Sequence, residues 1–127
     1  MLGKAIFEHL SSKPAIKSLV QARIFPVLVP QNVQFPCITY QLISDPRLQT
    51  LEGVSVPNPY VQIDCWAKTY NDAHALAAAV ETALECYRGL MGGLVQVHSC
   101  LLRSKADIFE PEVNDFRVSL DFSIWHT

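Results

Sequence analysis

The stretch YVQIDCWAKTYNDAHALAAAVE, residues 60–81, changes its hydrophobic period in the middle. In the first half, apolar and polar residues alternate, which is typical of a β-strand with one buried face. In the second half, apolar residues recur at every third or fourth position, which is typical of an amphipathic helix. Thr69 and Asp72 fit a capping-box pattern and predict that the helix begins near Tyr70. This junction requires a fold that packs a helix against a sheet.

The same stretch holds residue types that catalysis uses, namely Asp64, Cys65 and His74. Strand alternation sends Cys65 to the face opposite Asp64, and His74 lies in the exposed first turn of the predicted helix. A nucleophile and its base need atoms within about 3 Å of each other, which this spacing does not provide. The sequence also lacks GxGxxG, GxxxxGK[ST], HExxH and GxSxG motifs. We therefore expect no catalytic residues, no cofactor and no enzymatic activity.

The rest of the chain divides into further elements by the same criteria. Residues 2–10 and 14–20 predict two short helices, while three prolines within residues 23–36 favour an extended crossing or an irregular edge over a central strand. Residues 37–44 predict a strand, and 45–59 a long loop or a protruding hairpin. Strands are predicted for 94–104 and 115–126, joined by a charged connection, KADIFEPEVN. The prediction is one α+β domain over residues 1–127, with a four-stranded, mainly antiparallel sheet and helices on one face, in the order α-α-β-β-α-β-β.

Composition excludes several classes of partner. The chain has 127 residues, of which 50% are hydrophobic and 17% charged, so it can bury a core of its own. A net charge of −2 argues against binding to nucleic acid or to an anionic membrane. No apolar run approaches about 20 residues, and Lys4 and Glu8 interrupt the first one. We expect a protein that stays in the cytosol.

The cysteines and histidines are scattered. No CxxC or HxxxH pair occurs among Cys37, Cys65, Cys86 and Cys100 or the four histidines. This spacing predicts reduced, structurally passive thiols and no metal site.

Two sequence patterns carry a resemblance to a known family. PVLVPQ lies shortly before FPCITYQ, and VQIDCWAKTY continues into an alanine-rich helix. In these patterns the chain resembles the tail completion or tail terminator (head-tail joining) proteins of long-tailed bacteriophages and prophages. The resemblance rests chiefly on residues 23–85, since the strands after Gly93 are generic.

The resemblance implies a structural role in virion assembly. The resemblance implies that the protein caps the tail tube as a hexameric ring, ends tail polymerisation and docks to the head connector. The implied partners are the tail tube protein, the head completion protein and further copies of the chain. The implied location is the host cytoplasm during assembly and then the head-proximal end of the tail.

Two segments and two tryptophans form a hypothetical subunit or partner interface. The 44–58 loop carries apolar residues beside Arg47, and the 104–115 connection carries acidic ones beside apolar ones. The tryptophans lie on the sheet face opposite the aliphatic residues. The predicted interface residues are Arg47, Leu48, Leu51, Glu52, Val54, Trp66, Asp107, Ile108, Phe109, Glu110, Glu112 and Trp125. The alternative for Leu48, Leu51 and Val54 is that they fold back onto the core.

Two other functions stay open from the residues alone. Strand pairs with helices on one face resemble a ferredoxin-like regulatory domain, which would bind a small molecule in a pocket. A hydrolase or redox enzyme using one of the cysteines would need a thiol of perturbed pKa.

Overall fold

The structure is a computed structural model that describes residues 2–44, 47–49, 55–57, 59–111 and 114–126. The described residues form three helices and eight strands. The helices are α1 (Leu2–Ser11), α2 (Pro14–Val20) and α3 (Tyr70–Leu84). The strands are β1 (Ile24–Pro26), β2 (Cys37–Ser44), β3 (Arg47–Gln49), β4 (Ser55–Pro57), β5 (Tyr60–Ala67), β6 (Gly89–Met91), β7 (Val95–Glu110) and β8 (Asp115–His126).

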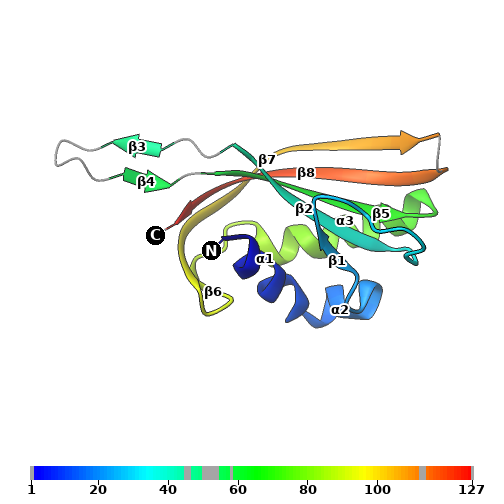
Figure 1. The fold of residues 1–127 in the computed structure, drawn as a ribbon, viewed down its shortest axis with the longest axis horizontal. Coiled ribbons are helices and arrows are strands. Elements are labelled where there is room, and N and C mark those ends of the chain that lie inside the picture. Colours follow the sequence, from blue (N-terminus) through cyan, green and yellow to red (C-terminus); the bar gives the residue numbers. More distant parts are fainter. Residues whose placement is uncertain (1, 45–46, 50–54, 58, 112–113, 127) are drawn as a thin grey trace.

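Six strands form one curved sheet in the order β1-β2-β5-β8-β7-β6 (Figure 1). β1 runs parallel to β2, and the other neighbouring strands are antiparallel. The sheet bends around the helices as a half-barrel. β3 and β4 pair only with each other among the described strands, as a separate two-stranded hairpin.

The prediction of a four-stranded, mainly antiparallel sheet is wrong, because β1 and β6 extend the sheet at both edges and β1 makes it mixed. Each added strand has three residues, too few to show an alternating pattern. Pro26 is tolerated in β1 because an edge strand can leave a missing N–H unused.

The connection predicted between the last two strands is also largely strand. β7 runs to Glu110 and pairs with β8 as far as Asp115. The rings of Phe109 and Phe116, directly paired in this register, have centroids 5.0 Å apart. Alternation is hard to see in this part of β7 because most of its residues are exposed on both faces.

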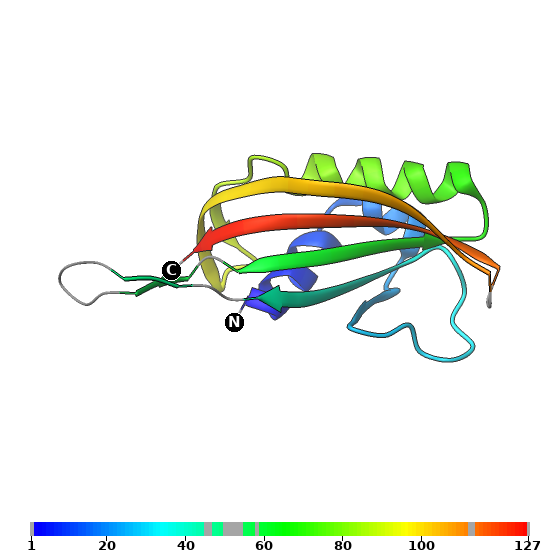
Figure 2. The ribbon, with the colours of Figure 1, turned by 90° about the horizontal axis from the view of Figure 1, so that it is seen from above.

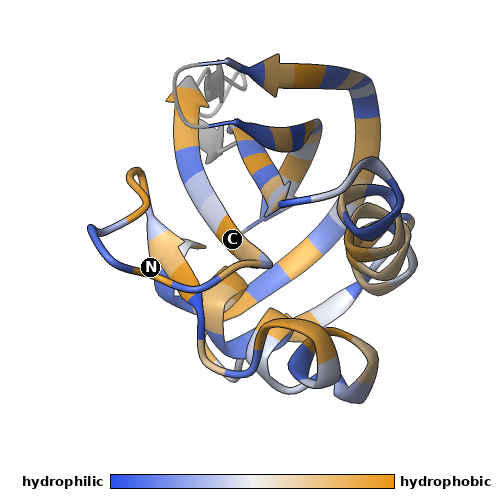
Figure 3. Cartoon of the chain, turned by 90° about the vertical axis from the view of Figure 1, so that its right-hand side faces the viewer, coloured by the Kyte–Doolittle hydropathy of each residue, from blue (hydrophilic) through white to orange (hydrophobic). Residues whose placement is uncertain are grey.

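The core lies between the helices and one face of the sheet. In Figure 3, which looks along the long axis, hydrophobic and hydrophilic bands alternate along the strands. The hydrophobic bands supply fully buried side chains such as Ile63, Leu120 and Phe122, each worth about 1.5–3 kcal/mol of burial. α3 covers them with a stripe that includes Leu76, and with small alanines that let the helix lie close.

The predicted start of α3 is confirmed. The Thr69 hydroxyl accepts a hydrogen bond from the Asp72 backbone N–H at 3.1 Å, which satisfies one of the free donors of the first turn. The strand and the helix of residues 60–81 therefore meet at a capped junction. This junction fixes α3 beneath β5 and β8.

Figure 2 shows the opposite face of the sheet, which has no helix in front of it. We call this the outer face. Figures 1 and 2 agree that the β3–β4 hairpin projects from one end of the molecule, where both ends of the chain also lie. The end of β7, the start of β8 and the segment 27–36 lie at the other end.

Candidate interaction surfaces

Arg117 of β8 links several side chains on the outer face. Its Nη1 lies 3.5 Å from Asp64 Oδ2, and its Nη2 lies 2.8 Å from Glu110 Oε1. The guanidinium carbon lies 5.2 Å from the centroid of the Trp66 ring. Asp64 also accepts hydrogen bonds from the Gln62 amide at 2.9 and 3.1 Å. The strands thus hold a connected polar network where a helix would otherwise pack.

A groove of about 630 Å³ adjoins this network at the ends of β5 and β7 and the start of β8. One wall is the segment between β1 and β2, and the other is formed by the ends of β5, β7 and β8. We call it the end groove. Its lining residues are Val27, Leu28, Val29, Pro30, Asn32, Val33, Phe35, Trp66, Lys68, Glu110 and Asp115.

The end groove is apolar with charges at one side. Val27 and Leu28 are 58% and 73% exposed, which is unusual for aliphatic side chains that are neighbours in the chain. Lys68 Nζ lies 2.7 Å from the buried Asp115 carboxylate and 4.6 Å from the centroid of the Phe35 ring. The groove could therefore receive an apolar segment that carries a polar or charged side chain.

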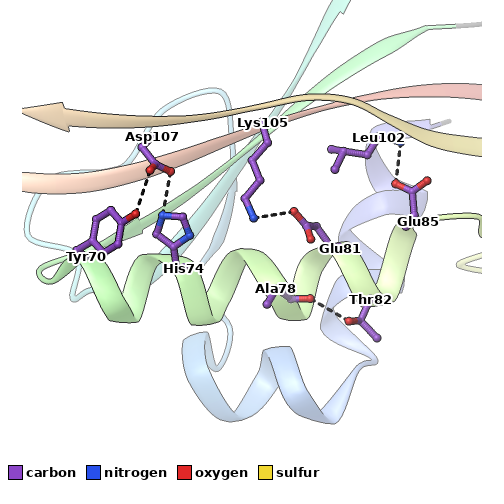
Figure 4. Close-up of polar contacts among 9 residues, drawn as sticks. All are labelled: Tyr70, His74, Ala78, Glu81, Thr82, Glu85, Leu102, Lys105 and Asp107. Atoms are coloured by element: carbon purple, nitrogen blue, oxygen red, sulfur yellow. Dashed lines mark hydrogen bonds and ion pairs between the residues drawn. The ribbon is translucent and has the colours of Figure 1, made fainter.

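A second set of contacts ties α3 to β7 (Figure 4). Tyr70 donates a hydrogen bond from its hydroxyl to Asp107 at 3.2 Å, and His74 Nε2 lies 2.9 Å from the same carboxylate. The hydrogen bond to Asp107 raises the pKa of Tyr70 above its usual value. Asp107 is thus engaged by a helix of its own chain.

Further along the helix, the same side of α3 continues this contact. Lys105 Nζ lies 3.0 Å from Glu81 Oε1, and Glu85 accepts a hydrogen bond from the Leu102 backbone N–H at 2.9 Å. Next to it, the Cys86 backbone N–H donates to the Cys100 carbonyl at 2.8 Å. Past the short pairing with β6, the edge of β7 that faces away from β8 is therefore contacted by α3 and by the residues that follow α3 in the chain.

The predicted interface residues do not form one cluster. Arg47 and Leu48 lie on β3 at one end, and the four residues predicted on 107–110 lie on β7 towards the other end. Leu51, Glu52, Val54 and Glu112 fall outside the described residues. Trp125 is half-buried on β8 opposite Ser99 of β7. The structure brings together Trp66 and Glu110, which both line the end groove.

Sequence reasoning missed the main part of the end groove. The sequence predicts the segment 27–35 only as an extended crossing or an irregular edge, without a role in binding. The available signal was its run of valines and Leu28 between prolines, because residues that cannot enter a central strand must bury their apolar side chains elsewhere or leave them exposed.

All four cysteines lie within the described residues and are free thiols. Burial raises the pKa of both Cys37 and Cys100 to about 12 and also raises that of Cys65, which makes these thiols poor nucleophiles. Cys86 is exposed. The described part of the chain holds no group of three or more potential metal ligands. Among its helices, none is long and apolar enough to span a membrane.

Comparison with known proteins gives two findings. A family model described as "Tail completion protein gp17" matches residues 4–127. A chain in a solved structure described as "Virion of native gene transfer agent (GTA) particle" matches with a TM-score of 0.81 and 17% identity, over 98% of this chain and 93% of that one. At this identity the second match shows a shared fold. No curated protein sequence matches the chain.

Proposed function

We propose, from the premise that this chain belongs to the tail completion protein family, that it caps the tail tube as a ring and ends tail polymerisation. In this proposal the ring is six-fold, sits at the head-proximal end of the tail and offers the docking surface for the head connector. Its partners are the tail tube protein and the head completion protein, and assembly takes place in the host cytoplasm. The family itself makes the chain a structural protein of a phage or phage-like tail.

The observation that carries the ring is the position of two segments in one elongated molecule. The β3–β4 strands lie at one end, and the end of β7 with the start of β8 lies at the other, so they do not meet within one copy (Figure 1). They can meet between copies, where one surface contacts a different surface of the next copy. Such a heterologous contact closes into a ring when its rotation allows it.

The charges of the two segments favour the same arrangement but provide little energy. Arg47 is the only cationic residue of the hairpin segment, and Asp107 and Glu110 lie on β7 near the other end. An exposed ion pair contributes about 0–1 kcal/mol. Free copies should therefore associate weakly, and the end of the tail tube should template the ring.

The test is a double substitution, Arg47→Glu with Leu51→Asp, in the phage or prophage that encodes the protein. We expect a folded protein, tails of uncontrolled length and few tails joined to heads. Tail length is measured by electron microscopy and joining by virion yield. The matched control is Arg88→Glu with Leu90→Asp, which makes the same changes at two exposed positions outside both segments.

A normal tail length and a normal virion yield from the Arg47→Glu, Leu51→Asp phage, with the protein absent from the tail end, would rule out this function. A control that fails as badly as the test variant would also contradict the proposed contact, because the effect would then not depend on the hairpin.

A further inference from the structure

We infer that the end groove of one copy receives the β3–β4 hairpin of the next copy. This inference rests on the proposed ring and names the two surfaces that hold it together. It adds the segment 27–35 and Lys68 to the interface, none of which the sequence had suggested. It also makes Trp66 and Glu110 parts of one receptor site.

The β3–β4 hairpin is a segment that packing against another surface would stabilise. β3 and β4 pair with each other and, among the described residues, with no strand of the six-stranded sheet, although β4 contacts β8 (Figure 1). A two-stranded hairpin is at best marginally stable alone, so it gains from packing against another surface. Leu48 is directly opposite Val56 in the register of the hairpin. The two strands therefore pair two aliphatic residues with each other.

The end groove has the complementary character. Val27 and Leu28 are largely exposed, although they are aliphatic and adjacent in the chain. Their burial by an aliphatic pair would remove apolar surface from water at both partners. The groove also has a volume of about 630 Å³, which is within the range of protein binding pockets.

Charge selects the orientation of the hairpin. Arg47 is adjacent to Leu48 and is the only cationic residue between residues 44 and 58. The groove contains two carboxylates, Glu110 and Asp115, and one amine, Lys68. Asp115 is already paired with Lys68, while Glu110 faces Arg117 with a side chain that is 35% exposed. Glu110 is thus the carboxylate that an incoming Arg47 can approach.

Geometry makes the contact intermolecular. The hairpin lies at the opposite end of the molecule from the segment 27–35 and the ends of β5 and β7, which line the groove, so it cannot reach the groove of its own copy (Figures 1 and 2). Each copy then offers one hairpin and one groove. This arrangement generates a head-to-tail series, which closes as a ring when the rotation between copies allows it.

The experiment is cysteine crosslinking in assembled particles and in the purified chain. Cys86→Ser removes the exposed thiol and leaves the three buried ones. In that background, Leu28→Cys and Val56→Cys are made singly and together, and a short bismaleimide is added. The matched control combines Val56→Cys with Leu90→Cys, since Leu90 of β6 is 58% exposed and lies outside the groove.

We expect the chain with both cysteines to form a ladder of covalent multimers in particles, ending at the size of the ring. In an equal mixture of the two single variants, the crosslinked products should be no larger than dimers. Neither single variant should crosslink to itself. This pattern is specific to a head-to-tail contact. The Leu90 control should stay monomeric.

Leu28→Asp adds a measurement that needs no crosslinker. We expect its circular dichroism and thermal midpoint to match those of Leu90→Asp, because both positions are exposed. Only Leu28→Asp should reduce incorporation of the protein at the tail end, by about tenfold or more if the contact is central to the ring.

The two proposals fail in different ways. Particles with normal tail length, with the protein at the tail end and with no crosslink between Leu28→Cys and Val56→Cys, would overturn the groove assignment and leave the ring in place. A crosslink from Leu28→Cys to another virion protein would overturn it as well. Tails that end normally without the protein would instead overturn the proposed function.

Discussion

The indole Nε1 of Trp66 donates a hydrogen bond to the Thr39 hydroxyl at 3.0 Å, between neighbouring strands on the outer face. Thr39 is only 3% exposed, although no helix covers that face. The Arg117 guanidinium carbon lies 5.2 Å from the centroid of the same indole ring. Trp66 is therefore anchored within its own chain while part of its ring faces the end groove.

This double role predicts that Trp66→Ala impairs assembly more than folding. Loss of a half-buried indole should lower the free energy of unfolding by about 2 kcal/mol. Trp66→Phe loses the hydrogen bond but keeps an aromatic ring, and should cost about 1 kcal/mol. Urea unfolding measures both values, and virion yield measures assembly. A large fall in the thermal midpoint with intact tail joining would show that Trp66 acts only within the protomer.

Gly92 and Gly93 provide a matched pair for a test of packing between β6 and α1. Both have positive φ, at +59° and +70°, which costs about 1 kcal/mol for alanine. A Cβ on Gly92 would lie 3.0 Å from the Ala5 carbonyl oxygen, whereas a Cβ on Gly93 would meet no atom within 4 Å. We expect unfolding free energies lower by about 3 kcal/mol for Gly92→Ala and by about 1 kcal/mol for Gly93→Ala.

Urea titration of both glycine variants checks this difference. Equal losses would mean that the backbone conformation alone sets the cost and that α1 does not pack against the turn at Gly92 as closely as 3.0 Å.

How far the fold could be predicted depended on the length of each signal. The helix beginning at Tyr70 and the strand before it were predictable, because each repeats its period several times and Thr69 supplies a cap. β1 and β6 were not, because three residues carry no period and their place in the sheet depends on pairing with distant strands. The mixed six-stranded sheet therefore depends on tertiary contacts, which the local sequence pattern does not show.

The candidate site was less predictable than the fold. Alternation placed Trp66 on the face opposite the aliphatic residues of β5, but its proximity to the segment 27–35 depends on how β1 and β2 bring that segment back to the sheet. The contacts of Asp107 were equally hidden, because Tyr70 and Asp107 are 37 positions apart in the sequence. The hydrophobic period of a segment determines which face of a helix or strand each residue occupies. A groove between helices and strands depends instead on how they are arranged in space.

His9 makes the stability of the protein depend on pH. Burial lowers the pKa of His9 below its usual value. The 2.9 Å hydrogen bond from His9 Nε2 to the Ala83 carbonyl raises this pKa, but only partly offsets the effect of burial. Below about pH 6.5 the unfolded chain binds a proton at this histidine, whereas the folded chain does so only at lower pH. The free energy of unfolding should therefore fall as the pH drops from about 6.5 towards the lowered pKa of the folded state.

The check is urea unfolding at several pH values between about 7.5 and 5, comparing the unchanged protein with His9→Gln. The variant keeps a donor for the Ala83 carbonyl but has no proton to gain, so its stability should fall less over this range. The control is His98→Gln, at an exposed position. An equal pH dependence in the protein and in His9→Gln would assign the effect to other groups.

The contact between Tyr70 and Asp107 predicts a titration that distinguishes a bond within the chain from one between copies. Tyr70 is half exposed, and its hydrogen bond to Asp107 raises its pKa because the bonded neutral hydroxyl is favoured over the phenolate. Asp107→Ala should lower the pKa of Tyr70 towards its usual value in the free, purified protein, as followed by NMR of the tyrosine ring. Glu110→Gln, three positions further along β7, should leave this titration unchanged. If Asp107→Ala also leaves it unchanged, the Asp107 carboxylate is not held by α3 in solution, and it becomes available to a neighbouring copy as the sequence had suggested.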